Sequence, residues 1–208
     1  MGYLVQKLFS VPVLILCFSL HELAHGLAAY LMGDKTAKYN GRLSLNPLKH
    51  VDWFGFLMLL IAGIGWAKPV PVNAGNFKDP KKGMAITAFA GPLMNIILVF
   101  ISLICWHLGS NIYVWNKYIV MFFELSVYYN AMLAMFNLLP IPPLDGSKVL
   151  LAFLPDKYYF KFMQYEQYGM IVILILVFTN ATSKILSIGV ENLISKLEKI
   201  VIMLLGVS

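Results

Sequence analysis

Residues 8–32 read LFSVPVLILCFSLHELAHGLAAYLM, an apolar run with two histidines and a glutamate near its centre. A helix needs about 20 predominantly apolar residues to cross the hydrocarbon core of a bilayer, so this run is long enough. About 21 Å of helix separate His21 from Lys7, and about 18 Å separate it from Gly33, at 1.5 Å per residue. The polar residues therefore lie at membrane depth, where a charged side chain costs about 2.5–3.5 kcal/mol and needs a partner or a function.

The polar residues of this run have the spacing of a metal site. His21 and His25 are four residues apart and share one face of a helix. Two imidazoles one turn apart can bind one Zn²⁺, and the adjacent Glu22 can reach a metal-bound water as general base. The same pattern arises by chance on the solvated faces of soluble helices, but an apolar span has no water to solvate it. We therefore expect one zinc ion per chain.

Composition indicates an all-α multi-pass membrane protein. Hydrophobic residues make up 60% of the chain and charged residues 12%, with a mean hydropathy of +0.76. A typical soluble domain is about a quarter charged. The net charge of +6 comes from lysines in short connections, without a basic stripe, so no nucleic-acid partner is expected. No polar region is long enough for a separate soluble domain, and residues 1–208 are expected to form a single membrane-embedded core.

Apolar runs predict a bundle of about five to six transmembrane or re-entrant helices. They cover residues 8–32, 53–66, 84–107, 118–139 and 168–188, followed by an amphipathic tail at 190–205. The run at 53–66 is short for a full crossing and is expected to be a tilted span or a re-entrant segment.

One stretch, from Trp66 to Asn73, is predicted to be a short extended or β segment. Pro69 and Pro71 remove backbone donors and push the residues before them towards extended geometry. A plain interfacial loop is an equally good interpretation of the same residues.

A catalytic zinc ion generally has three protein ligands and an open position, so one ligand remains to be found. The candidates at plausible depth are His50, Asp52, His107, Glu124 and Asp145. Asp145 is favoured because it follows an apolar span and three closely spaced prolines, in NLLPIPPLDG at residues 137–146. Irregular backbone at membrane depth is tolerated only where protein buries it or where it lines a wet cavity. Taken alone, Asp-Gly would be read as a surface turn.

Three segments together resemble the site-2 protease family of intramembrane zinc metalloproteases. They are HELAHG at residues 21–26, FAGPLMN at 89–95 and NLLPIPPLDG at 137–146. The likeness extends over most of residues 11–150 and is greatest to the compact branch of the family, which lacks PDZ and CBS domains.

The resemblance implies an activity and a role for each site residue. It implies zinc binding by His21, His25 and Asp145, acid–base catalysis by Glu22, and contributions to catalysis from Asn137 and Asn95. It also implies cleavage of transmembrane protein substrates, that is, regulated intramembrane proteolysis in the cell membrane. The expected partners are such a substrate, the lipid bilayer and a regulatory membrane protein. For Asn95 and Asn137, hydrogen bonding between helices is an equally good interpretation.

Three other functions fit parts of the pattern. A membrane metal transporter or metal-binding module would also place histidines and acids in a bilayer. A catalytically idle homologue would serve as a binding module. A zinc hydrolase acting on lipids or small amides would use the same residues.

Overall fold

The computed structural model describes residues 3–62, 65–164, 166–179 and 181–206. Its regular elements in these ranges are helices, with no strand among them. The segment predicted to be extended or β, from Trp66 to Asn73, has one isolated antiparallel bridge, between Ala67 and Val51, and is otherwise irregular. The predicted β character is therefore not confirmed.

Three of the described helices are long and apolar enough to cross a membrane. They are α1 (Tyr3–Leu31), α4 (Pro80–His107, continued to Ile112 by a π-helical turn) and α5 (Lys117–Asn137). They coincide with the apolar runs at residues 8–32, 84–107 and 118–139. The prediction of an all-helical integral membrane protein is confirmed.

The other predicted runs form shorter helices. α3 (Trp53–Ala62) has ten residues, about 15 Å of helix, which is half the thickness of the hydrocarbon core. The run at 168–188 is divided between α8 (Glu166–Phe178) and α9 (Ser183–Leu205). At the break, the Thr179 hydroxyl donates to the carbonyls of Ile175 and Leu176, a local bond that competes with helix continuation. The predicted count of five to six membrane helices is thus not confirmed.

The chain forms two compact units. The first contains residues 1–17, 95–137 and 171–208, and the second contains residues 18–94 and 138–170. Each is described separately.

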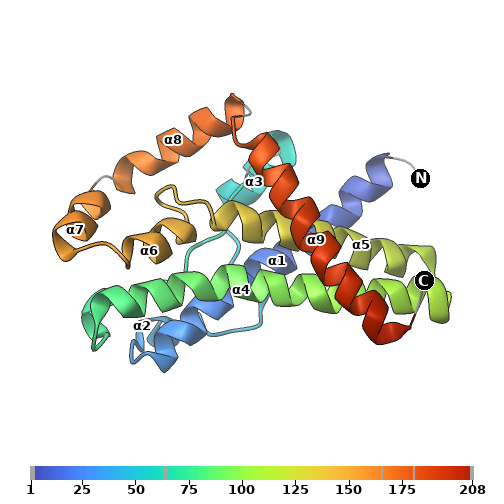
Figure 1. The fold of residues 1–208 in the computed structure, drawn as a ribbon, viewed down its shortest axis with the longest axis horizontal. Coiled ribbons are helices and arrows are strands. Elements are labelled where there is room, and N and C mark those ends of the chain that lie inside the picture. Colours follow the sequence, from blue (N-terminus) through green and yellow to red (C-terminus); the bar gives the residue numbers. More distant parts are fainter. Residues whose placement is uncertain (1–2, 63–64, 165, 180, 207–208) are drawn as a thin grey trace. The chain divides into compact units, whose positions relative to one another are not determined.

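In the first unit, α9 packs across the end of α4 and across α5 (Figure 1). The buried residues of this cluster are Val99, Leu103, Val127, Ala131, Val190 and Val201. Both α9 members, Val190 and Val201, belong to the apolar face of the predicted amphipathic tail. At the cluster's edge, Nε2 of His107 lies 3.2 Å from the Glu198 carboxylate. Most of the apolar face of the tail is therefore covered by protein, while Ile200 is exposed.

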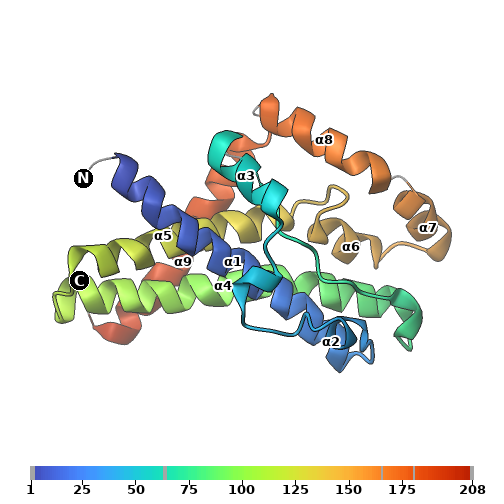
Figure 2. The ribbon, with the colours of Figure 1, turned by 180° about the vertical axis from the view of Figure 1, so that it is seen from behind.

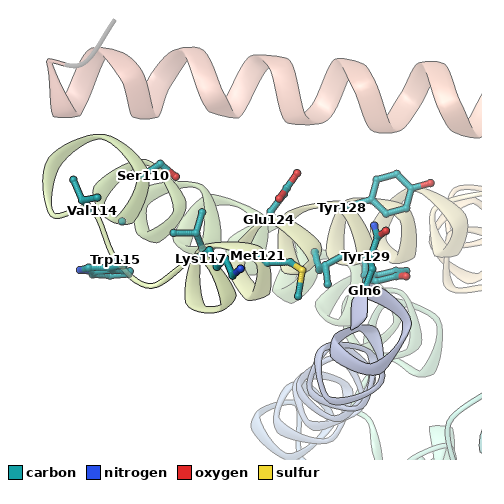
Figure 3. A pocket seen from close by; sticks show the side chains of 12 residues that line it. Gln6, Ser110, Val114, Trp115, Lys117, Met121, Glu124, Tyr128 and Tyr129 are labelled. Atoms are coloured by element: carbon teal, nitrogen blue, oxygen red, sulfur yellow. The ribbon is translucent and has the colours of Figure 1, made fainter. Parts of the chain in front are cut away.

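A groove of about 800 Å³ lies beside α5 in the same unit (Figure 3). Lys117, Met121 and Glu124 follow one another along α5 at this groove, and Gln6 of α1 and Trp115 are among the other residues of its wall. Glu124, one of the candidate metal ligands, thus faces this groove.

In the second unit, two connections pack against α1 (Figure 2). α2 (Thr36–Tyr39) follows α1, and a 3-10 turn, η2 (Ala74–Asn76), precedes α4. A Cβ on Gly26 would lie 2.7 Å from the Leu43 side chain and 3.2 Å from that of Val70. A glycine at position 26 therefore lets the chain on either side of α3 approach α1. α6 (Asp145–Leu151) and α7 (Asp156–Gln164) complete this unit.

Candidate metal centre

α1 brings the two histidines of the sequence motif together. His21 and His25 are 4% and 9% exposed, and their Nε2 atoms lie 3.0 Å apart. The two rings are nearly perpendicular, at 88°. The one-turn spacing of a helix accounts for this arrangement, because side chains four residues apart project from the same face.

Asp145 supplies a third donor atom to the same point. It is the first residue of α6, and its Oδ2 lies 3.2 Å from His21 Nε2 and 3.3 Å from His25 Nε2. Donor atoms bound at 2.0–2.1 Å to a tetrahedral zinc ion lie about 3.3 Å from one another. The triangle of 3.0, 3.2 and 3.3 Å between these three atoms therefore fits a zinc ion.

Gly91 leaves room for the two imidazoles against α4. A Cβ at position 91 would lie 2.4 Å from His25 Nε2 and 2.6 Å from His21 Cε1. No real Cβ tolerates such distances, so any larger residue would displace the rings. The glycine of FAGPLMN is therefore part of the metal centre's wall.

A main-chain carbonyl fixes the orientation of His25. Its Nδ1 lies 2.7 Å from the carbonyl oxygen of Thr87 in α4. A carbonyl only accepts hydrogen bonds, so Nδ1 carries the proton and donates. The Nε2 lone pair then points towards Asp145 and His21, which is the usual arrangement of a metal-bound histidine.

Glu22 is held beside the donor triangle by the segment before η2. Glu22, His21 and His25 each offer a ligand atom within 4.8 Å of the other two. One oxygen of Glu22, Oε2, accepts a hydrogen bond of 2.9 Å from the backbone N–H of Val70. The glutamate is therefore near the metal position, with one carboxylate oxygen already occupied.

The two predicted asparagines belong to the first unit. Asn95 is fully buried and donates from Nδ2 to Asn130 Oδ1 on α5, at 2.8 Å. Asn137 is the last residue of α5 and donates to the Leu133 carbonyl at 3.0 Å. The Asn95 bond is the helix–helix contact considered above. Catalytic roles for both residues remain predictions.

Two of the other candidate ligands have different partners. Asp52 accepts a hydrogen bond from Gly55 N at the start of α3, at 2.8 Å. His50 is 1% exposed, and its Nε2 lies 2.9 Å from the Ser44 carbonyl oxygen. A histidine in a lysine-rich connection is expected at the surface, but this expectation is wrong for His50, because the chain folds over it where Lys68 N donates to the His50 carbonyl.

Sequence reasoning missed the residues that support the site through the backbone. Every residue has a main-chain carbonyl and every residue except proline has a main-chain N–H, so residue type gives no signal for the Thr87 carbonyl or the Val70 N–H. Asp34 was also missed. A fully buried carboxylate is unusual, but its burial is visible only in the structure. Gly91 was quoted within a motif but was given no role.

Comparisons with known proteins show which family the chain is related to. Peptidase family M50 matches residues 107–180, which include Asp145. "Putative zinc metalloprotease YwhC" of Bacillus subtilis (strain 168) is 42% identical over 183 residues, covering 86% of this chain and 84% of that protein. "Putative zinc metalloprotease MJ0611" of Methanocaldococcus jannaschii is 34% identical over 158 residues, covering 68% of this chain and 72% of that protein. No solved structure matches the chain. The chain belongs to peptidase family M50, the site-2 protease family.

Proposed function

We propose that this protein is an intramembrane zinc metalloprotease that hydrolyses peptide bonds of membrane-spanning protein substrates. One observation carries the proposal. Nε2 of His21, Nε2 of His25 and Oδ2 of Asp145 converge within 3.3 Å of one another, with the Glu22 carboxylate beside them. Two of these ligands lie within an apolar span, and the relatives' names refer to zinc and proteolysis.

His21, His25 and Asp145 would hold one zinc ion per chain. When bound, zinc supplies a Lewis acid that acidifies a water molecule and polarises a peptide carbonyl. The Thr87 carbonyl keeps the His25 ring in the tautomer that leaves Nε2 free for the metal.

Glu22 moves the proton. The Val70 N–H occupies Oε2, so Oε1 is the oxygen that takes a proton from the attacking water. The same oxygen then delivers the proton to the leaving amine, as general acid. A glutamine at this position has no basic oxygen for this transfer.

Asn137 and Asn95 are assigned supporting roles. Asn137 would position the substrate backbone or stabilise the negative charge on the carbonyl oxygen. Asn95 would act as the polar residue of the neighbouring span. Family likeness supports both roles.

The protein would act within the cell membrane as a single catalytic core. We assign α3, α8 and α9 to the membrane-embedded part, as re-entrant or peripheral helices. Together with α1, α4 and α5, they give about six membrane helices in total. This follows from the apolar character of α3 and α8, whose exposed side chains include Phe54, Ile171 and Ile175. Its partners would be a transmembrane substrate, the bilayer and a regulatory membrane protein.

The test compares purified wild-type protein with Glu22→Gln. The proposal predicts that Glu22→Gln retains one zinc ion per chain and loses cleavage of a fluorophore-labelled single-span peptide in detergent. The matched control is Glu191→Gln, which changes an exposed carboxylate on α9 and should leave cleavage unchanged. Cleavage by Glu22→Gln at the wild-type rate would refute the proposal.

A membrane proteome comparison then identifies the natural substrate. Proteins cleaved in cells with wild-type enzyme, but intact with Glu22→Gln, are the candidates. Their cut positions show whether hydrolysis takes place within a membrane-spanning segment.

A further inference from the structure

Asp34 is a buried carboxylate outside the metal centre whose charge is met entirely by hydrogen-bond donors. It lies three residues after the end of α1 and is fully buried. Its Oδ1 accepts from Thr36 N at 3.0 Å, from Thr36 Oγ1 at 2.5 Å and from Asn76 Nδ2 at 2.7 Å. Its Oδ2 accepts from Asn73 N at 2.7 Å. Burying a carboxylate is costly, so an arrangement with four donors indicates that this position has a specific task.

Two of the four donors belong to the segment that contacts Glu22. Asn73 precedes η2 and Asn76 is its last residue, and Asn73 Oδ1 also caps this turn by accepting from Gly75 N at 3.0 Å. Three residues before Asn73, Val70 donates its N–H to Glu22 Oε2. Asp34 thus anchors one end of a short segment, and the other end contacts the proposed general base.

The segment between the two contacts is stiff. Pro69 and Pro71 flank Val70 and fix φ at both positions. Asn73 is extended, with φ −111° and ψ 105°. A displacement at the Asp34 end is therefore transmitted to Val70 with few torsions available to absorb it.

We propose that Asp34 is a positioning residue for catalysis. Through Asn73 and Asn76, it sets the place of the Val70 N–H, which holds Oε2 of Glu22 and keeps Oε1 directed at the attacking water. The inference rests on the proposed function, because it assigns Glu22 the role of general base. Small displacements of a catalytic group cost up to about a hundredfold in rate, which sets the expected size of the effect.

A purely structural role for Asp34 makes a different prediction. Asp34 would then support the unit as a whole, and its loss would lower activity independently of Val70. A double-mutant cycle distinguishes the two roles, because residues that act through one contact are not additive.

The cycle combines Asp34→Asn with Val70→Pro. Proline at position 70 removes the N–H that reaches Glu22, and its neighbours are already prolines. We expect each single variant to lower kcat for the labelled single-span peptide by about ten- to a hundredfold, with KM and zinc content little changed. In the double variant, kcat should be no lower than in Val70→Pro alone. Asp79→Asn is the matched control, because Asp79 also accepts a backbone hydrogen bond, from Lys82 N at 3.1 Å, but does not contact this segment.

A milder variant covers the case in which Asp34→Asn fails to fold. Asn76→Ala removes one of the four donors, and its smaller loss of kcat should likewise disappear in the Val70→Pro background. Multiplicative effects in either cycle, or an unchanged kcat in Asp34→Asn, would overturn the inference.

Failure of this inference can be told apart from failure of the proposed function. If Glu22→Gln is inactive while the effects are multiplicative, only the role of Asp34 is refuted. If Glu22→Gln cleaves normally, the proposed function itself fails.

Discussion

The carbonyl oxygen of Thr87 lies 2.7 Å from Nδ1 of His25, so a main-chain atom of one membrane helix orients a proposed metal ligand on another. The Thr87 side chain has no part in this contact. Its buried hydroxyl has no hydrogen-bond partner among the residues that the structure describes. The contact therefore depends on the position of the α4 backbone and not on the residue type.

Thr87→Val should preserve zinc binding. The substitution replaces an unpartnered buried hydroxyl with a methyl group of similar size, so we expect a stability gain of about 1 kcal/mol. Zinc per chain, measured by atomic absorption, should be unchanged, and thermal unfolding in detergent should shift upward. Loss of zinc would show that the hydroxyl takes part in the site.

Gly91→Ala should abolish zinc binding without unfolding the protein. The added Cβ would lie 2.4 Å from His25 Nε2, and the adjacent imidazoles cannot both move away within a packed helix pair. Zinc content should fall by most of its wild-type value, while helical circular dichroism is retained. Phe89→Leu, which alters a side chain 40% exposed on the same helix, should bind zinc normally. Full zinc occupancy in Gly91→Ala would contradict the geometry of this wall.

Asp145→Ala should lower zinc affinity more than about a hundredfold, beyond the 10–100-fold loss typical of outer-shell partners. The change removes the donor atom at 3.2 and 3.3 Å from the two histidine nitrogens. Competition with a zinc chelator gives the affinity. Asp156→Ala, which changes an exposed acid at the start of α7, serves as the control. Equal affinities would mean that the third ligand lies elsewhere.

The local part of the site could be predicted from sequence. His21, Glu22 and His25 lie within one helical turn, so their proximity follows from helix geometry and does not depend on packing. Asp145 lies far along the chain. It was favoured over the other polar residues at plausible membrane depth, and the family resemblance implies the same residue. In the structure its Oδ2 lies 3.2 and 3.3 Å from the two histidine nitrogens, and zinc binding by Asp145 stays a prediction.

The supporting contacts and the helix count could not be predicted. Thr87 and Val70 act through backbone groups, whose partners depend on how helices and connections pack. Asp34 lies in the turn between α1 and α2, where aspartate is an ordinary residue, and only its complete burial makes it notable. Apolar runs show which segments prefer lipid or a core, but the break near Thr179 depends on local side-chain hydrogen bonds.

Acidification should remove the stability that Asp34 contributes. Burial alone would raise the pKa of its carboxyl, but the hydrogen bonds from Thr36, Asn73 and Asn76 outweigh burial, and the pKa lies below its ordinary value of 3.8. A lowered pKa in the folded state means that the stabilisation is complete above about pH 4 to 5 and is lost as pH falls through 3.8 and below. The difference in melting temperature between wild type and Asp34→Asn should therefore be constant from pH 7 to 5 and shrink towards pH 3. A difference that grows on acidification would contradict this sign.

Asn95 and Asn130 should stabilise the protein as a pair. Their side chains share a 2.8 Å hydrogen bond between two membrane helices, and Asn130 also donates to the Ser126 carbonyl. Such bonds are worth about 0.6–2 kcal/mol in membranes. A cycle of Asn95→Ala and Asn130→Ala, followed by thermal unfolding, should give a coupling energy in this range. A kcat loss confined to Asn95→Ala, without coupling in stability, would instead favour a catalytic role for Asn95.

The proposed ligands come from opposite parts of the chain, two from the first helix and one from the start of α6. A nascent chain that has not yet reached Asp145 therefore has only two of the three proposed ligands. During synthesis the emerging helices would lie among other membrane proteins without the ability to cut them. Proteolytic competence would then begin only after α6 has been made and has met the first helix, so the order of synthesis would itself act as a safeguard against premature damage.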